Sequence, residues 1–326
     1  MLKLNATMKR ILGILSVLLL ITACDDGNLT VENIDFTDVT VQKCSDKDIL
    51  YKVKDTEMLI LAIPASVFVN DETPENTSIE TTIDNNNIQV FYRQYNGTVS
   101  SDNICPTIPA ATPNLTEEWF VTSGTVQFTS TAVKSVNAST GVTQITGYKH
   151  YIVLKNITFQ KPDGSTQFYE TYPFGNYTTP TTALAFGFND EADKSTCDNR
   201  IFNFNSSEAF ILDLGDYDNL FQNSVTTTPR VALVSSTNKV VYRLYSGIVN
   251  DAYFCATTLP TTPTLTQEWI AENGVADVSG IIEVTTTTFG SGFLHTIHLK
   301  KLTMTRGNSD FYLGDDYLYG SFVVTP

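Results

Sequence analysis

Five cysteines carry the most reactive side chains of this 326-residue sequence. A thiolate is a nucleophile and a metal ligand, whereas in an oxidising compartment thiols pair as disulfides. The five lie at positions 24, 44, 105, 197 and 255, so one is left over when the others pair. Cys24 stands apart because an apolar run closely precedes it. The segment before Cys24 indicates whether the chain is exported, and therefore whether the other four cysteines remain thiols or pair as disulfides.

The first 23 residues have the layout of a secretory signal peptide. Lys9 and Arg10 precede an apolar run over 11–21, which is about half of a membrane-spanning helix. The run leads into Leu20-Ile21-Thr22-Ala23-Cys24, which resembles a bacterial lipobox. The resemblance implies that a transferase attaches diacylglycerol to the Cys24 thiol and that a peptidase then cuts before it. We expect a signal peptide over 1–23, followed by the lipidated cysteine and a tether over 24–31.

An internal repeat organises the rest of the chain. Residues 91–124 match residues 241–274 without gaps at 14 of 34 positions, where ordinary residue usage gives about two by chance. A repeat of this size indicates a tandem duplication of one domain. We expect the two units to cover residues 32–178 and 183–326.

The repeat also selects among the three ways of pairing four cysteines. Each unit holds one early and one central cysteine, so symmetry favours Cys44–Cys105 and Cys197–Cys255 over pairs that cross between units. Each bridge would close a loop of about 60 residues, which the chain-entropy model values at roughly 4 kcal/mol.

The only two tryptophans, Trp119 and Trp269, occupy equivalent positions in the repeat. Exposed indoles stack on sugar rings, so the pair is a candidate glycan site. Leu115 and Leu265 each precede a tryptophan by four residues, which on a helix places both side chains on one face. That pattern favours packing against the core. We expect core packing, with glycan stacking as the alternative.

The patterns for a metal site are weak. His295 and His298 lie three apart in an expected strand and therefore point to opposite faces. His150 corresponds to His295 in the repeat. The acidic loops 189–193 and 213–218 offer oxygens without EF-hand spacing. We predict no metal site and no cofactor.

Catalytic patterns are equally weak, and we predict that the chain is not an enzyme. Gly307-Asn-Ser-Asp-Phe311 lacks the last glycine of a Gly-x-Ser-x-Gly elbow. Paired cysteines leave no thiol nucleophile. Glu118 and Glu268 recur in the repeat, but a surface or capping role accounts for them more simply than a carboxylate pair for glycoside hydrolysis.

Most of the mature sequence predicts β-strands, because short runs rich in Thr, Val, Ile, Tyr and Phe alternate apolar with polar residues. Pro162-Asp-Gly164 predicts a hairpin turn. Strands at this spacing favour an all-β fold of two tandem antiparallel β-sandwich domains. We expect one short helix in each unit, at 113–124 and 263–274, because capping side chains and a final glycine delimit both segments.

Charge excludes one class of partner. Removing the signal peptide takes away three of the 20 basic residues and none of the 35 acidic ones, which leaves 17 basic side chains. Such a surface repels phosphate backbones, so we expect no nucleic-acid binding. No later apolar run is long enough to span a bilayer, so we expect membrane contact through the N-terminal lipid, whose two or more acyl chains anchor stably.

The lipobox with Asp25-Asp26, the Asn/Thr-rich β sequence and the duplicated Trp motif resemble Bacteroidota lipoproteins of flavobacterial type with a duplicated β domain. The resemblance carries no known activity. It implies a protein anchored in the outer membrane and facing the cell surface. The leading hypothesis is a non-catalytic envelope lipoprotein that is structural or binds another envelope protein. A glycan-binding surface lipoprotein of a polysaccharide-utilisation system is the alternative, and a glycoside-processing enzyme is the third class.

Overall fold

The computed structural model describes residues 33–325. The chain divides into two units, 1–36 and 37–326, and every element below lies in the second. Strands dominate, joined by two four-residue helices, α2 (Tyr217–Leu220) and α3 (Asp251–Phe254), and two single 3₁₀ turns, η1 (Ala65–Val67) and η2 (Ser101–Asn103). The predicted all-β fold is confirmed at this level, with antiparallel sheets throughout the described strands.

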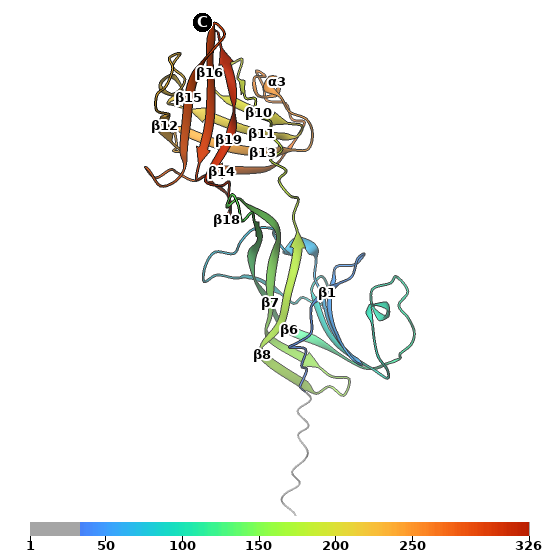
Figure 1. Cartoon of the computed structure of the whole chain (residues 1–326). Helices are drawn as coiled ribbons and strands as arrows, with labels where there is room; N and C mark the ends of the chain where they lie inside the picture. Colours follow the sequence, from blue (N-terminus) through green and yellow to red (C-terminus); the bar gives the residue numbers. More distant parts are fainter. Residues whose placement is uncertain (1–32, 326) are drawn as a thin grey trace, which may run out of the picture. The chain divides into compact units, whose positions relative to one another are not determined.

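The first half of the chain forms one curled sheet of eight strands (Figure 1). Seven follow one another in the order β1 (Gln42–Lys43), β2 (Ile49–Lys54), β3 (Glu57–Ala62), β5 (Gln89–Tyr95), β6 (Leu115–Val136), β7 (Thr143–Gln160) and β8 (Thr166–Pro180). The eighth, β4 (Ile79–Thr82), pairs with the second part of β6.

The second half forms two sheets. The larger has the order β18 (Ser309–Tyr312), β17 (Thr303–Arg306), β14 (Leu265–Ala271), β13 (Asn238–Tyr245), β11 (Glu208–Leu214), β10 (Ile201–Asn205) and β9 (Asp193–Lys194). The smaller has the order β12 (Arg230–Leu233), β15 (Ile281–Phe289), β16 (Gly292–Lys300) and β19 (Asp316–Val324).

Strand pairing in the two halves follows the same register. Tyr92 lies opposite Trp119, and at a displacement of 150 Tyr242 lies opposite Trp269. Both pairs of strands carry a β-bulge at the same point, before Tyr95 and before Tyr245. The strand order β1-β2-β3-β5-β6 corresponds in this register to β9-β10-β11-β13-β14.

The two halves differ after the tryptophan, because β6 continues through a bend whereas its equivalent β14 ends. β6 pairs with β5 up to Phe120 and with β4 from Thr125, so one strand serves both parts of the curled sheet. The bend between these parts contains Gly124, whose φ is +133° and where a Cβ atom would lie 2.7 Å from Ile157 Cγ2. In the second half the chain breaks at the equivalent place, and β14 and β15 belong to separate sheets.

The predicted helices at 113–124 and 263–274 are wrong, because β6 and β14 occupy these segments. Burial alternates through Trp119, Phe120 and Val121, which is the period of a strand. Thr116, near the start of the first segment, donates its hydroxyl to the Gln94 carbonyl of β5, 2.9 Å away. Aromatic and β-branched side chains favour the pleated sheet once a neighbouring strand is available.

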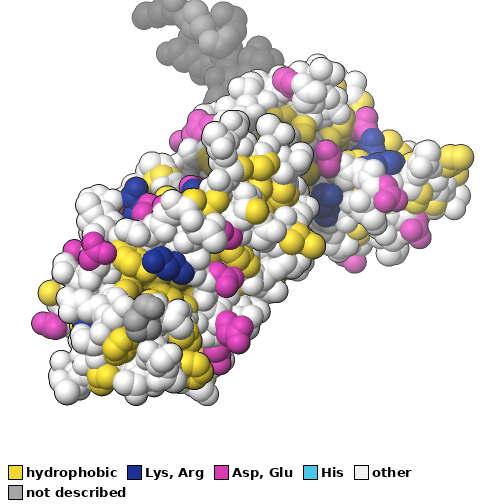
Figure 2. Space-filling view, turned by 90° about the horizontal axis from the view of Figure 1, so that it is seen from above, with side chains coloured by type: hydrophobic (Ala, Val, Ile, Leu, Met, Phe, Trp, Pro, Cys, Tyr) yellow, Lys and Arg dark blue, Asp and Glu magenta, His cyan; other side chains and the backbone are white. Residues whose placement is uncertain are grey.

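One other local prediction is confirmed. β7 and β8 meet in a hairpin at Pro162–Gly164, where the Lys161 amide donates to the Ser165 carbonyl. Acidic side chains are scattered over the face shown in Figure 2 and do not gather in one patch.

Candidate functional site

Cys24 and the signal peptide lie outside the described residues, so lipidation stays a prediction. The other four cysteines form the two disulfides that the repeat predicts, Cys44–Cys105 and Cys197–Cys255. Each disulfide ties the start of its half to the loop that follows β5 or β13. No thiol therefore remains among residues 33–325.

Trp119 and Trp269 are both in the core, at 1% and 3% exposure. The Trp119 ring packs 4.8 Å from Tyr92, and the Trp269 ring packs 5.0 Å from Phe311. Each indole N–H donates to the side chain two residues earlier, Glu117 or Gln267. Neither ring presents a face to a sugar in bulk solvent, which agrees with core packing and not with glycan stacking at these two residues.

The recurring glutamates are held in ion pairs. Arg93 lies 2.6 Å from Glu118, and Arg243 lies 2.6 Å from Glu268, each across neighbouring strands. Burial lowers the pKa of Arg243, but the hydrogen bond to Glu268 and the charge of that carboxylate raise it. The pKa therefore lies above its ordinary value. These carboxylates are therefore engaged by guanidinium groups at the sheet surface.

Two histidines are buried at equivalent places, and both are held by hydroxyl groups. His150 Nδ1 lies 2.7 Å from Ser130 Oγ, and its Nε2 lies 2.9 Å from Thr179 Oγ1. Thr179 donates its own proton to Asn70, so it accepts from Nε2–H. Burial lowers the pKa of His150 to about 4.

His295 has a similar environment, except that one of its ring nitrogens has no hydrogen-bond partner among the described residues. Its Nδ1 lies 2.9 Å from Thr286 Oγ1, which accepts a hydrogen bond from Arg230. His295 Nε2 has no partner among the described residues. Burial, and then the charge of Arg230, lower the pKa of His295. Both rings are therefore neutral core groups near pH 7, and His298 instead pairs with Asp316 at the surface.

The acidic loops use their oxygens within the protein. Asn189 Oδ1 accepts from the Glu191 amide, and Asp216 Oδ2 accepts from Asn238. Across residues 33–325, no group of three or more His, Cys, Asp or Glu side chains is placed to hold a metal ion.

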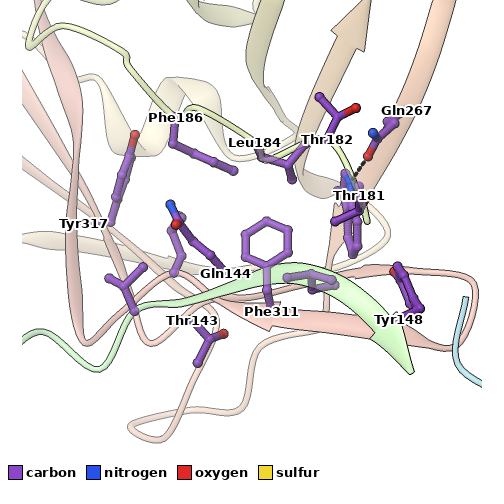
Figure 3. Close-up of a pocket in the computed structure, with 14 residues that line it drawn as sticks. Thr143, Gln144, Tyr148, Thr181, Thr182, Leu184, Phe186, Gln267, Phe311 and Tyr317 are labelled. Atoms are coloured by element: carbon purple, nitrogen blue, oxygen red, sulfur yellow. Dashed lines mark hydrogen bonds between the residues drawn. The ribbon is translucent and has the colours of Figure 1, made fainter. Parts of the chain in front are cut away.

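The structure contains an apolar cavity of about 90 Å³ that the sequence did not predict (Figure 3). Its walls come from the start of β7, the segment after β8, and strands β14, β18 and β19. Phe186, Phe311 and Tyr317 surround the same space, and Gln144 lies between Tyr317 and Phe311 (Figure 3). Trp269 also lines it, whereas Trp119 does not.

Bonds between the two halves position this cavity. Asp71 Oδ1 accepts from Ser309 Oγ at 2.7 Å and from the Asn308 amide at 3.0 Å, at the turn between β17 and β18. Tyr148, which lines the cavity, donates to Ser309 Oγ at 3.1 Å. The Tyr312 amide donates to Thr143 Oγ1 at 2.7 Å. The β17–β18 hairpin is thereby fixed against the start of β7.

A subtle signal for the cavity exists in the sequence. In the repeat, Gln267 stands where the first half has Glu117, so the carboxylate beside the tryptophan becomes an uncharged amide. By register, Phe311 stands where the first half has Gln167. Both replacements put a less polar side chain beside the second tryptophan, while each tryptophan ring carries one cation, Lys161 or Arg306.

Comparison with known proteins adds no relative: no protein-family model matches the chain, and neither the curated proteins nor the solved structures contain a significant match. Within residues 33–325, no helix is long and apolar enough to cross a membrane.

Proposed function

We propose that this protein is a non-catalytic lipoprotein of the cell envelope, anchored in the outer membrane through a lipid on Cys24 and serving to bind a partner molecule. The observation that carries the proposal is the lipobox-like segment Leu20–Cys24 in a chain whose four other cysteines form two disulfides. Disulfides persist in exported proteins and are rare in the cytosol. A leftover cysteine at the end of an apolar leader is the residue that lipid attachment requires.

A binding role fits the chemistry of the described residues better than catalysis does. The recurring glutamates are paired with arginines, and the buried histidines contact hydroxyl groups. The cavity, in contrast, is mostly apolar with a few polar side chains, which is the usual composition of a ligand pocket.

Metabolic labelling with a fatty acid tests the anchor. Label should enter the wild-type protein and be absent from Cys24→Ser, because no other residue accepts the diacylglycerol. Label retained in Cys24→Ser would disprove the proposed anchor. Protease treatment of intact cells then tests the surface orientation. The added protease should cut the protein if it faces the cell surface and should leave it intact if it faces the periplasm.

The finer architecture that we propose is a tandem duplication of a β-sandwich domain, with units over 32–178 and 183–326. Support comes from the shared register at Tyr92–Trp119 and Tyr242–Trp269 and from the matching disulfides. The described strands of 42–180 pair among themselves, as do those of 193–324.

Glycan binding remains the second candidate because a different pair of aromatic rings favours it. Phe120 and Phe168 are 41% and 61% exposed, and their register with Gln160 and Thr158 places them on one face of the curled sheet. A glycan array with the wild-type protein and with Phe120→Ala/Phe168→Ala tests this. Binding that disappears in the double variant would favour the glycan role, and an array without any signal would exclude the glycans on it.

A further inference from the structure

We propose that the cavity beside Trp269 binds a single aromatic ring of a small, uncharged molecule. The inference specifies a ligand class for the binding role proposed above, and it rests on that role but not on the lipid anchor. Its basis is the shape and chemistry of the walls that the two halves of the chain build together.

The walls favour a ring. The Phe311 ring lies 5.0 Å from Trp269 and 5.5 Å from Phe186, at interplanar angles of 68° and 73°. Aromatic rings prefer such edge-to-face arrangements, because the positive edge of one ring meets the negative face of another. Tyr317 adds a fourth ring at 84° to Phe186. A ligand ring entering this space can repeat the same contacts with its neighbours.

The charge of the walls excludes ions. No Asp, Glu, Lys, Arg or His side chain is among the residues that line the cavity. Burial raises the pKa of Tyr317, with further contributions from Glu208 and Asp190, so this hydroxyl stays neutral. The Arg306 guanidinium lies 4.8 Å from the Trp269 ring centre but donates to the Asn70 carbonyl and does not line the cavity. A carboxylate or ammonium group placed here would lose its water without a charged side chain in the walls to replace it, which is strongly unfavourable.

A few polar side chains in the walls can orient the ligand by hydrogen bonding. The side chains of Gln144, Thr181 and Thr182 line the cavity, and none of them makes a hydrogen bond to another described residue. An amide both donates and accepts, as does a hydroxyl. A hydroxyl or carbonyl substituent on the ligand ring would therefore find a partner at the same site.

The size limits the ligand to one ring. The cavity of about 90 Å³ exceeds several-fold the roughly 10–15 Å³ that one water molecule needs, and it is smaller than the engineered apolar cavity of about 150 Å³ that holds benzene, so at most one ring can enter it. Most side chains in its walls are apolar or aromatic, so a cluster of ordered waters would lack the partners that each buried water requires.

The first half of the chain provides an internal control. Its tryptophan has Glu117 within hydrogen-bond distance and the Lys161 ammonium 4.0 Å from the ring centre. Beside Trp269 the carboxylate is replaced by the Gln267 amide, and the Arg306 guanidinium lies 4.8 Å from the ring centre. Trp119 does not line the cavity and should therefore report no ligand.

The experiment uses bromine quenching of tryptophan fluorescence in the full chain, excited where only tryptophan absorbs. The probe is 4-bromobenzyl alcohol, and 4-bromobenzoate has the same ring with a negative charge. Trp119→Phe leaves Trp269 as the reporter, and Trp269→Phe leaves Trp119. We expect saturable quenching in Trp119→Phe, none in Trp269→Phe, and at least tenfold weaker binding of the benzoate, which corresponds to about 1.4 kcal/mol.

Filling the cavity provides the second arm. In the Trp119→Phe background, Thr182→Tyr or Gln144→Phe should weaken the alcohol at least tenfold. Thr178→Tyr, at an exposed threonine of β8 that does not line the cavity, should leave binding unchanged. Equal quenching of both tryptophans, equal affinity for the benzoate, or no saturable quenching at all would each overturn the proposal. None of these results affects the labelling test for Cys24, so the two proposals fail separately.

Discussion

At the scale of single residues, His150 makes stability depend on pH. The ring is fully buried, and burial lowers its pKa to about 4, whereas the unfolded chain has a value near 6.5. Between these values the unfolded state binds a proton that the folded state does not, so stability is full above pH 6.5 and is lost as pH falls towards 4. The loss should reach about 3 kcal/mol. Denaturant unfolding from pH 7 to 4 measures it, and His150→Gln should flatten the slope; an unchanged slope contradicts this assignment.

The tryptophans are the other residue-scale test. Trp119→Ala and Trp269→Ala should each cost roughly 3–5 kcal/mol, because both rings fill the core. Phe168→Ala, at a 61% exposed position, should stay within about 0.5 kcal/mol. Thermal denaturation of the three variants gives the comparison. A midpoint of Trp269→Ala equal to that of the wild type would show that this side chain does not support the fold.

At the scale of elements, Asp71 holds the β17–β18 hairpin. It accepts from Asn308 and Ser309, and removing a charged acceptor that is partly exposed should cost about 1–2 kcal/mol. Asp71→Ala should therefore speed hydrogen exchange at the amides of the hairpin, whereas Glu75→Ala, an exposed carboxylate nearby, should not. Equal exchange in both variants would show that the hairpin is held by packing alone.

The elements also show where sequence reasoning succeeded and where it failed. Alternating runs such as 152–159 predicted strands correctly, because alternation directly reports one buried face. The helix predictions for 113–124 and 263–274 were wrong because capping side chains and a final glycine are local signals, whereas pairing with β5 or β13 depends on tertiary structure. The cavity could not be predicted from the sequence for the same reason. Phe186 and Phe311 are 125 positions apart, and no pattern along the chain states that their rings lie 5.5 Å apart.

At the scale of the whole molecule, the disulfides should map within each half. Peptide mapping without reduction should join Cys44 to Cys105 and Cys197 to Cys255, at sequence separations of 61 and 58. A peptide that links cysteines of different halves would contradict both this pairing and the proposed symmetry.

The proposed duplication predicts that residues 183–326 fold alone. All described strands from β9 to β19 find their partners within this segment, and so does Cys197. Its core includes Trp269, Ile297 and Leu299, and the buried residues of this cluster all lie between Ala192 and Phe322, with Ile145 of the first half packed against them. Unfolding of the fragment should therefore be cooperative.

The fragment should nevertheless differ from the full chain at one place. Ile145 and Tyr148 of the first half line the cavity, so their absence opens it to water. Trp269 is the only tryptophan in the fragment, and its emission should shift to longer wavelength than in the full chain with Trp119→Phe. Cooperative unfolding with this shift would mean that the second half folds by itself and that the cavity exists only where the two halves meet. Non-cooperative unfolding would instead indicate that residues 37–326 form a single folding unit. An unshifted emission spectrum would show that the first half does not shield Trp269 from water.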